Sequence, residues 1–93
     1  ILIFFLLIKG VIYTPPISDG CVAGSMRKLL INIINKEYDL KIQSISNSQI
    51  EESEEIILSN AITGVRRVTS FENRTYSEEA FYNFLIKSLN KLI

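Results

Sequence analysis

Two short segments of the sequence have the residue types that a phosphate-binding site needs. The first is AGS at residues 23–25, which directly precedes a run with helical periodicity. The first turn of a helix has backbone N–H groups without intrahelical partners, and the helix dipole places partial positive charge there. Small residues let an anion approach these N–H groups. The segment is therefore a candidate anion site, although a glycine here also fits a tight strand-to-helix connection.

The second segment is SNAITG at residues 59–64, a small polar turn that follows the apolar run at residues 56–58. Ligands of α/β proteins often bind at the carboxyl ends of strands, so this turn is a second candidate contact. Its alternative interpretation is a plain hairpin loop. Two such loops in one small domain favour a phosphate-bearing ligand between them.

Several classes of function are excluded by composition. The chain of 93 residues has no histidine and a single cysteine, Cys21, so neither the usual zinc sites nor a Ser/His or Cys/His nucleophilic pair can form. The lone cysteine excludes an internal disulfide and suits a reducing compartment, the cytoplasm. Ten basic and ten acidic residues give zero net charge without a basic face. We therefore expect a small-molecule partner and neither nucleic acid nor a membrane.

The N-terminal run ILIFFLLI, residues 1–8, has two interpretations. A signal or membrane segment is one, but the run lacks a basic n-region and is far shorter than the span of about 20 residues that a bilayer requires. A buried strand fits a short continuous apolar run better. Lys9 and Gly10 then predict a tight hairpin to a second strand at residues 11–13, which Pro15 and Pro16 end. A strand at the first residue and the absence of an initial methionine suggest a piece of a longer polypeptide.

Helical periodicity predicts a helix from Ser25 to Lys36. Its expected inward residues are Met26, Leu29, Leu30, Ile33 and Ile34, and its expected solvent-facing residues are Arg27, Lys28, Asn32 and Asn35. Further along, we expect a strand at residues 41–46, a turn or helical turn at 48–52, and a strand pair at 56–60 and 65–71 around the small polar turn.

A second helix is predicted near the C-terminus. Ser77 stands at the expected N-cap, with Glu78 and Glu79 in the first turn, where the helix dipole favours negative charge. The expected inward residues are Phe81, Phe84, Leu85, Ser88, Leu89 and Leu92. The order hairpin, helix, strand, strand pair and helix predicts a single α/β or α+β domain over residues 1–93.

The segment TPPISDGCVAGSMRKLL, residues 14–30, resembles a motif of the fold-type IV pyridoxal-phosphate enzymes, the class IV aminotransferases. ESEEIILSNAITGVRRV, residues 52–68, is similar to a second motif of the same family, and the similarity covers essentially the whole chain. The family includes branched-chain and D-amino-acid aminotransferases and 4-amino-4-deoxychorismate lyase. The resemblance implies the C-terminal domain of such an enzyme, mostly β-sheet with two principal helices.

The resemblance also implies the site residues for pyridoxal 5′-phosphate. After Gly24, the backbone amides of Ser25 and Met26 hold the cofactor phosphate, and Asn60 or Ala61 adds a contact. Some members have a threonine at the positions of Met26 and Ala61, and both hydroxyls are absent here.

The loop through Ile62 and Thr63 is implied to face the substrate carboxylate. The resemblance places the catalytic Schiff-base lysine and the glutamate that pairs with the pyridine nitrogen upstream of the matched region, so no residue of this chain is assigned a catalytic role. Lys28 and Lys36 are interpreted as solvent-facing. We therefore expect the chain alone to be inactive.

For the complete enzyme, the resemblance implies a homodimer that transfers an amino group between an amino acid and a 2-oxo acid. The alternative within the family is 4-amino-4-deoxychorismate lyase, because the turn ITGVRR, residues 62–67, lacks a glutamate. The alternative from another class is a non-catalytic α/β binding module.

Overall fold

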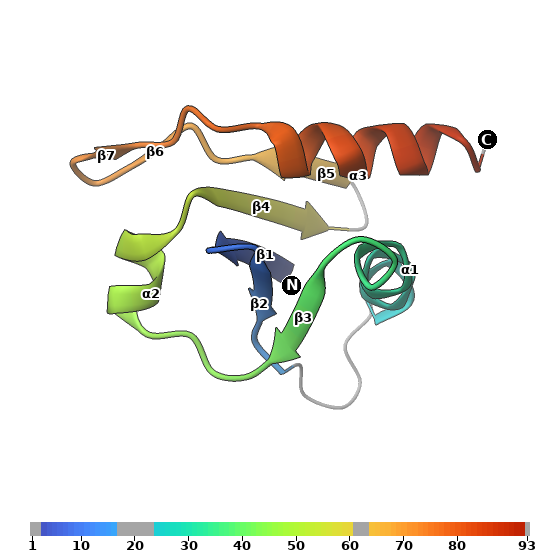
Figure 1. Cartoon of the computed structure of the whole chain (residues 1–93), viewed down its shortest axis with the longest axis horizontal. Helices are drawn as coiled ribbons and strands as arrows, with labels where there is room; N and C mark the ends of the chain where they lie inside the picture. Colours follow the sequence, from blue (N-terminus) through green and yellow to red (C-terminus); the bar gives the residue numbers. More distant parts are fainter. Residues whose placement is uncertain (1–2, 17–23, 61–63, 93) are drawn as a thin grey trace.

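The computed structural model describes residues 3–16, 24–60 and 64–92, and its centre is a five-stranded mixed sheet (Figure 1). The strand order is β3-β2-β1-β4-β5, with β2 and β3 parallel and the other neighbours antiparallel. These strands are β1 (Ile3–Ile8), β2 (Val11–Thr14), β3 (Asp39–Ile42), β4 (Glu55–Asn60) and β5 (Gly64–Arg67). The other elements are α1 (Gly24–Ile34), α2 (Asn47–Glu52), β6 (Ser70–Phe71), β7 (Arg74–Thr75) and α3 (Ala80–Asn90). The predicted α/β or α+β class is confirmed.

The tight hairpin predicted at the N-terminus is also confirmed. Ile8 pairs with Val11, and the two residues between them, Lys9 and Gly10, both have positive φ angles, 49° and 80°. This left-handed two-residue turn matches the natural twist of the strands that it joins. Strand β2 ends at Thr14, directly before the two prolines.

Both faces of the sheet are covered by apolar side chains. Helices α1 and α3 pack on one face, where the core consists of Phe5, Leu7, Ile12, Leu30, Ile33, Ile34, Ile57, Phe81 and Leu85. On the opposite face, Leu6 and Ile56 pack with the buried Tyr76, and Ile50 of α2 lies against them. Because successive side chains of a strand point to opposite faces, a strand covered on both sides is apolar without interruption. This explains the uninterrupted apolar run IFFLLI, residues 3–8, as the central strand β1. None of the helices in the described part of the chain has the length and apolarity to cross a membrane.

The start of α3 differs from the prediction. The helix begins at Ala80 rather than after Ser77, and its N-cap, Glu79, makes no side-chain capping hydrogen bond. A residue from another element takes that role: the carboxylate of Glu55 on β4 accepts hydrogen bonds from the backbone N–H groups of Phe81 at 2.8 Å and Tyr82 at 3.0 Å. A buried carboxylate therefore replaces the predicted local cap.

The segment before α3 is extended because tertiary contacts hold it. Tyr76 is 3% exposed, and its N–H donates to the Thr69 carbonyl at 2.9 Å. Arg67 donates from Nη1 to the Tyr76 carbonyl at 2.9 Å, and its Nη2 lies 3.6 Å from a carboxylate oxygen of Glu79. Arg67 therefore ties β5 to the residues that precede α3.

Two side chains were assigned to the wrong environment. Arg27 was expected to face solvent but is only 9% exposed, and its Nη2 donates to the Pro15 carbonyl at 3.2 Å. Leu92 was expected to face inward but is 63% exposed, because α3 ends at Asn90. The other residues of this region that were predicted to face solvent are exposed, namely Lys28, Asn32, Asn35 and Lys36.

The middle of the chain has strand β3 earlier than predicted, at Asp39–Ile42 instead of residues 41–46. The parallel pairing of β3 with β2 fixes its limits, with Asp39 opposite Val11 and Ile42 opposite Thr14. Ser46 caps α2 instead, because its hydroxyl accepts from the Gln49 N–H while the Gln49 side chain accepts from the Ser46 N–H. This capping box makes the predicted helical turn a short helix.

The strand predicted at residues 65–71 is divided into two pieces. Strand β5 ends at Arg67, and the N–H of Val68 donates to the Ile56 carbonyl at 2.9 Å. The chain then forms the separate β6–β7 hairpin around a turn at Glu72 and Asn73. The division lets β6 and β7 leave the main sheet and approach α2 (Figure 1).

Candidate functional site

The predicted site residues lie at one end of the sheet. Gly24, Ser25 and Met26 are the first three residues of α1, and Asn60 is the last residue of β4. Helix α1 contacts β4, and Figure 1 shows β4 running towards α1. The structure therefore brings together the two elements that carry the predicted phosphate contacts. The other predicted contacts, Ala61, Ile62 and Thr63, lie outside the described residues, as does Cys21.

The backbone N–H groups at the N-terminus of α1 have no nearby acidic side chain of the helix to bind. Its first turn contains no acidic residue, and among the described side chains none accepts a hydrogen bond from the amides of Ser25 or Met26. Ser25 is exposed, whereas Met26 is half-buried against the core. The amides at this helix end can therefore bind an external anion.

Two buried polar atoms occur at the same end of the sheet. The Ser59 side chain is fully buried, and its Oγ has no hydrogen-bond partner. Arg27, in the first turn of α1, donates from Nη2 to the Pro15 carbonyl, but its buried Nε has no partner. An unsatisfied buried polar group costs about 1–3 kcal/mol, so such groups point to a ligand or an ordered water.

Neither of these residues was named as a site residue from the sequence. Ser59 was considered only as part of the small polar turn, although its position two residues after Ile57 places it on the same face of β4. Arg27 was assigned to solvent, and the helical periodicity contains no signal that it is buried. The contact with Pro15, twelve residues earlier, exists only in the folded chain.

The buried Glu55 is engaged in structure rather than available for chemistry. Its side chain is 1% exposed, and both carboxylate oxygens accept N–H groups of α3. Tyr38 packs edge-on against Phe81, with ring centroids 5.2 Å apart. Burial raises the pKa of the Tyr38 hydroxyl above its ordinary value, and the negative charges of Glu55 and Glu37 raise that pKa further.

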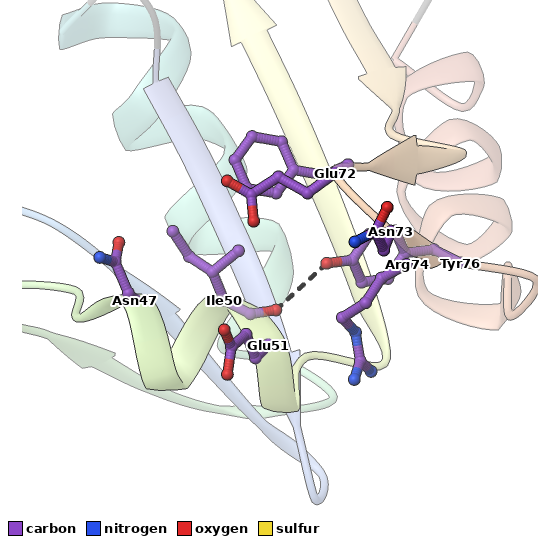
Figure 2. Close-up of a pocket in the computed structure, with 8 residues that line it drawn as sticks. Asn47, Ile50, Glu51, Glu72, Asn73, Arg74 and Tyr76 are labelled. Atoms are coloured by element: carbon purple, nitrogen blue, oxygen red, sulfur yellow. Dashed lines mark hydrogen bonds between the residues drawn. The ribbon is translucent and has the colours of Figure 1, made fainter.

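A hollow among the described residues lies elsewhere, between α2 and the β6–β7 hairpin (Figure 2). It has a volume of about 320 Å³, and Tyr76 donates from its hydroxyl to the Ile50 carbonyl at 3.2 Å across it. The guanidinium carbon of Arg74 lies 5.7 Å from the centre of the Tyr76 ring. The other lining residues are Asn47, Glu51, Phe71, Glu72 and Asn73, none of which was predicted as a site residue.

A second hollow of about 260 Å³ adjoins the first and is entirely apolar. It is lined by Phe4, Leu6, Ile50, Ile56, Leu58, Val68 and Phe71, on the face of the sheet opposite to α1 and α3. Within the described ranges there is also no group of three or more His, Cys, Asp or Glu side chains that could hold a metal ion. The end of the sheet near α1 therefore remains the best candidate site.

Comparisons with known proteins agree on one family. The sequence profile of the family described as "Amino-transferase class IV" matches residues 3–71. A candidate 4-amino-4-deoxychorismate lyase from Legionella pneumophila has 28% sequence identity and a TM-score of 0.82, over 97% of this chain and 34% of that one. None of the curated protein sequences searched is significantly similar to this chain.

Two aminotransferases have the same fold at lower identity. The branched-chain amino acid aminotransferase of Escherichia coli is 18% identical, with a TM-score of 0.85 over 98% of this chain and 32% of that one. An aminotransferase from Brucella abortus, bound to pyridoxal 5′-phosphate, is 14% identical, with a TM-score of 0.85 over 97% and 32%. The chain thus spans about a third of the length of the structures that it matches.

Proposed function

This chain belongs to the amino-transferase class IV family, and on that premise we propose that it supplies the phosphate-binding part of a pyridoxal 5′-phosphate enzyme. The observation that carries the proposal is the N-terminus of α1, whose amides at Ser25 and Met26 have no acceptor among the described side chains. Two unsatisfied buried polar atoms at the same end of the sheet, on Arg27 and Ser59, support it. This set of donors fits a phosphate group.

Each part of the proposed site has a distinct task. The amides of Ser25 and Met26 bind the phosphate oxygens, and the absence of a Gly24 side chain leaves room for them. Asn60 or Ala61, at the end of β4, supplies a further contact. When bound, pyridoxal 5′-phosphate supplies an aldehyde that combines with amino groups and a ring that withdraws electrons from the attached carbon.

The substrate contact is proposed for the turn after β4, where Ile62 and Thr63 face the substrate carboxylate. The proposed reaction of the whole enzyme is transfer of an amino group between an amino acid and a 2-oxo acid, in the cytoplasm and as a homodimer. The chain spans about a third of its structural neighbours, which supports a role as the C-terminal domain. The catalytic lysine would come from outside these 93 residues, so the chain alone is expected to be inactive.

A second candidate function is 4-amino-4-deoxychorismate lyase activity. It is favoured by the 28% identity to the Legionella pneumophila structure and by the lack of a glutamate at residues 62–67. Steady-state assays of the whole enzyme distinguish the two: the transferase converts a 2-oxo acid to an amino acid, and the lyase releases pyruvate and 4-aminobenzoate.

The site is tested by titrating the ¹⁵N-labelled chain with inorganic phosphate and with pyridoxal 5′-phosphate. We expect the amide resonances of Ser25, Met26 and Asn60 to shift together, and Gly24→Val to weaken phosphate binding at least tenfold while α1 stays folded, because a branched side chain blocks the approach of the anion. Gly24→Ala serves as the control with a smaller side chain. An absent response in the folded wild-type chain would favour a non-catalytic binding module.

A further inference from the structure

Among the residues that the structure describes, the buried hydroxyl groups have hydrogen-bond partners except at one position. Thr14 is fully buried, and its Oγ1 donates to the Phe4 carbonyl at 2.8 Å. Ser53 is 2% exposed, and its Oγ donates to the Gln49 carbonyl at 2.7 Å. Ser59 is 0% exposed, but its Oγ has no hydrogen-bond partner among the described residues. Because an unsatisfied buried hydroxyl destabilises a fold, this exception calls for a physical reason.

Arg27 presents a second exception nearby. Its guanidinium carries five N–H donors, yet with the described residues it makes one hydrogen bond, from Nη2 to the Pro15 carbonyl, and no ion pair. The residue also lies in the first turn of α1, at the positive end of the helix dipole. A buried cation at that end is unfavourable unless an anion binds beside it.

The topology places both exceptions on the same side and at the same end of the sheet. Ser59 shares a face of β4 with the core residue Ile57, and this is the face that α1 and α3 cover. Ser59 pairs with Ile3 at the start of β1, and Arg27 contacts Pro15 directly after the end of β2. Because β1 runs antiparallel to β2 and β4, these positions lie at one end of the sheet.

We propose that Ser59 and Arg27 are ligand-binding residues of the anion site, donating from the Ser59 hydroxyl and the Arg27 Nε–H to the phosphate held by the N-terminus of α1. This inference rests on the proposed function. It explains two unsatisfied donors by a single ligand, and it adds a buried positive charge to a phosphate that carries two negative charges. The side chains of Ser59 and Arg27 would also supply hydrogen-bond donors in a site where Met26 and Ala61 lack side-chain donors.

The first test uses the unmodified chain. The ¹⁵N-labelled protein is titrated with inorganic phosphate while the Arg27 Nε–H resonance is followed together with the amides of Ser25 and Met26. We expect the three signals to shift along one binding curve. The Nε–H of Arg74, which lies in the hollow beside α2, is the internal control and is expected to stay unchanged.

The second test compares two buried serines. Ser59→Ala is expected to weaken phosphate binding about tenfold, which equals about 1.4 kcal/mol, while the midpoint of urea unfolding without phosphate stays the same or rises. Ser53→Ala is the matched control, since its hydroxyl is satisfied internally. That variant is expected to lower the unfolding midpoint and to leave the phosphate affinity unchanged.

The outcomes separate this inference from the proposed function. If the amides of Ser25 and Met26 respond to phosphate but the Arg27 Nε–H does not, and Ser59→Ala binds as tightly as wild type, the inference is wrong and the α1 site stands. If those amides do not respond at all, both the proposed function and the inference are overturned.

Discussion

The N-termini of α1 and α3 have the same backbone chemistry but opposite surroundings. Each helix has eleven residues, and neither has an acidic residue in its first turn. At α3, a buried carboxylate from Glu55 accepts the N–H groups of Phe81 and Tyr82. At α1, no described acceptor binds the amides, and the first turn contains the buried cation of Arg27. One helix end is neutralised within the fold, whereas the other has no acceptor among the described residues.

Strand β4 carries the polar side chains discussed for both helix N-termini. Glu55 and Ser59 are four residues apart on β4, so both side chains point to the face that the helices cover. Glu55 supplies an anion and thereby fixes α3 in place. Ser59 supplies a neutral hydroxyl, which can donate to a phosphate but does not repel it. The comparison teaches that the charge placed opposite a helix N-terminus decides whether that terminus supports the fold or a binding site.

The largest expected effect comes from removing the internal anion of α3. Glu55→Ala leaves the buried N–H of Phe81 and the partly buried N–H of Tyr82 without acceptors. It is expected to lower the free energy of unfolding by about 3–5 kcal/mol, measured by urea denaturation. Glu55→Gln keeps one acceptor and is expected to lose less. Substitution of the exposed Glu52 by Gln is the matched control. A loss below about 1 kcal/mol in Glu55→Ala would contradict the capping role.

The next largest effect is expected from adding a carboxylate to the first turn of α1. Ser25→Asp places a carboxylate in the first turn, where we expect it to raise the free energy of unfolding by about 0.3–1 kcal/mol and to weaken phosphate binding at least tenfold. Ser25→Asn has nearly the same shape without the charge and serves as the control. Equal phosphate affinity in these two variants would show that the charge opposite α1 does not control the site.

The smallest effect concerns the half-buried phenol of Tyr38 beside α3. Because the pKa of Tyr38 is raised in the folded chain, the folded state retains its proton to higher pH than the unfolded state does. Its contribution to stability is therefore present below the ordinary pKa of 10.0 and is lost as the pH rises above it. We expect Tyr38→Phe to reduce the loss of stability between pH 9 and 11 by a few tenths of a kcal/mol, measured by urea denaturation across that range. A pH profile identical to that of the wild type would contradict this assignment.

Local patterns of residues predicted most of the elements. The Lys9-Gly10 turn, the buried strand predicted at residues 1–8 and the first long helix each depend on neighbours in the chain. The turn is confirmed, the strand is confirmed over residues 3–8, and the helix predicted from Ser25 to Lys36 is found at Gly24–Ile34. The limits of β3 and the division of the strand at residues 65–71 could not be predicted. They depend on pairing with β2 and on the contacts of Arg67 and Tyr76, which join distant residues.

The candidate site divides in the same way. The sequence by itself determined that small residues stand at the start of α1 and that its first turn contains no acid. It also determined, through the lack of histidine and the single cysteine, that the usual zinc sites and histidine catalysis are excluded. Only the tertiary structure decided that Glu55 caps α3, that Arg27 is buried and that Ser59 lacks a partner. The physical reason is that periodicity reports which way a side chain points along one element, whereas burial and hydrogen bonding depend on what a different element places opposite it.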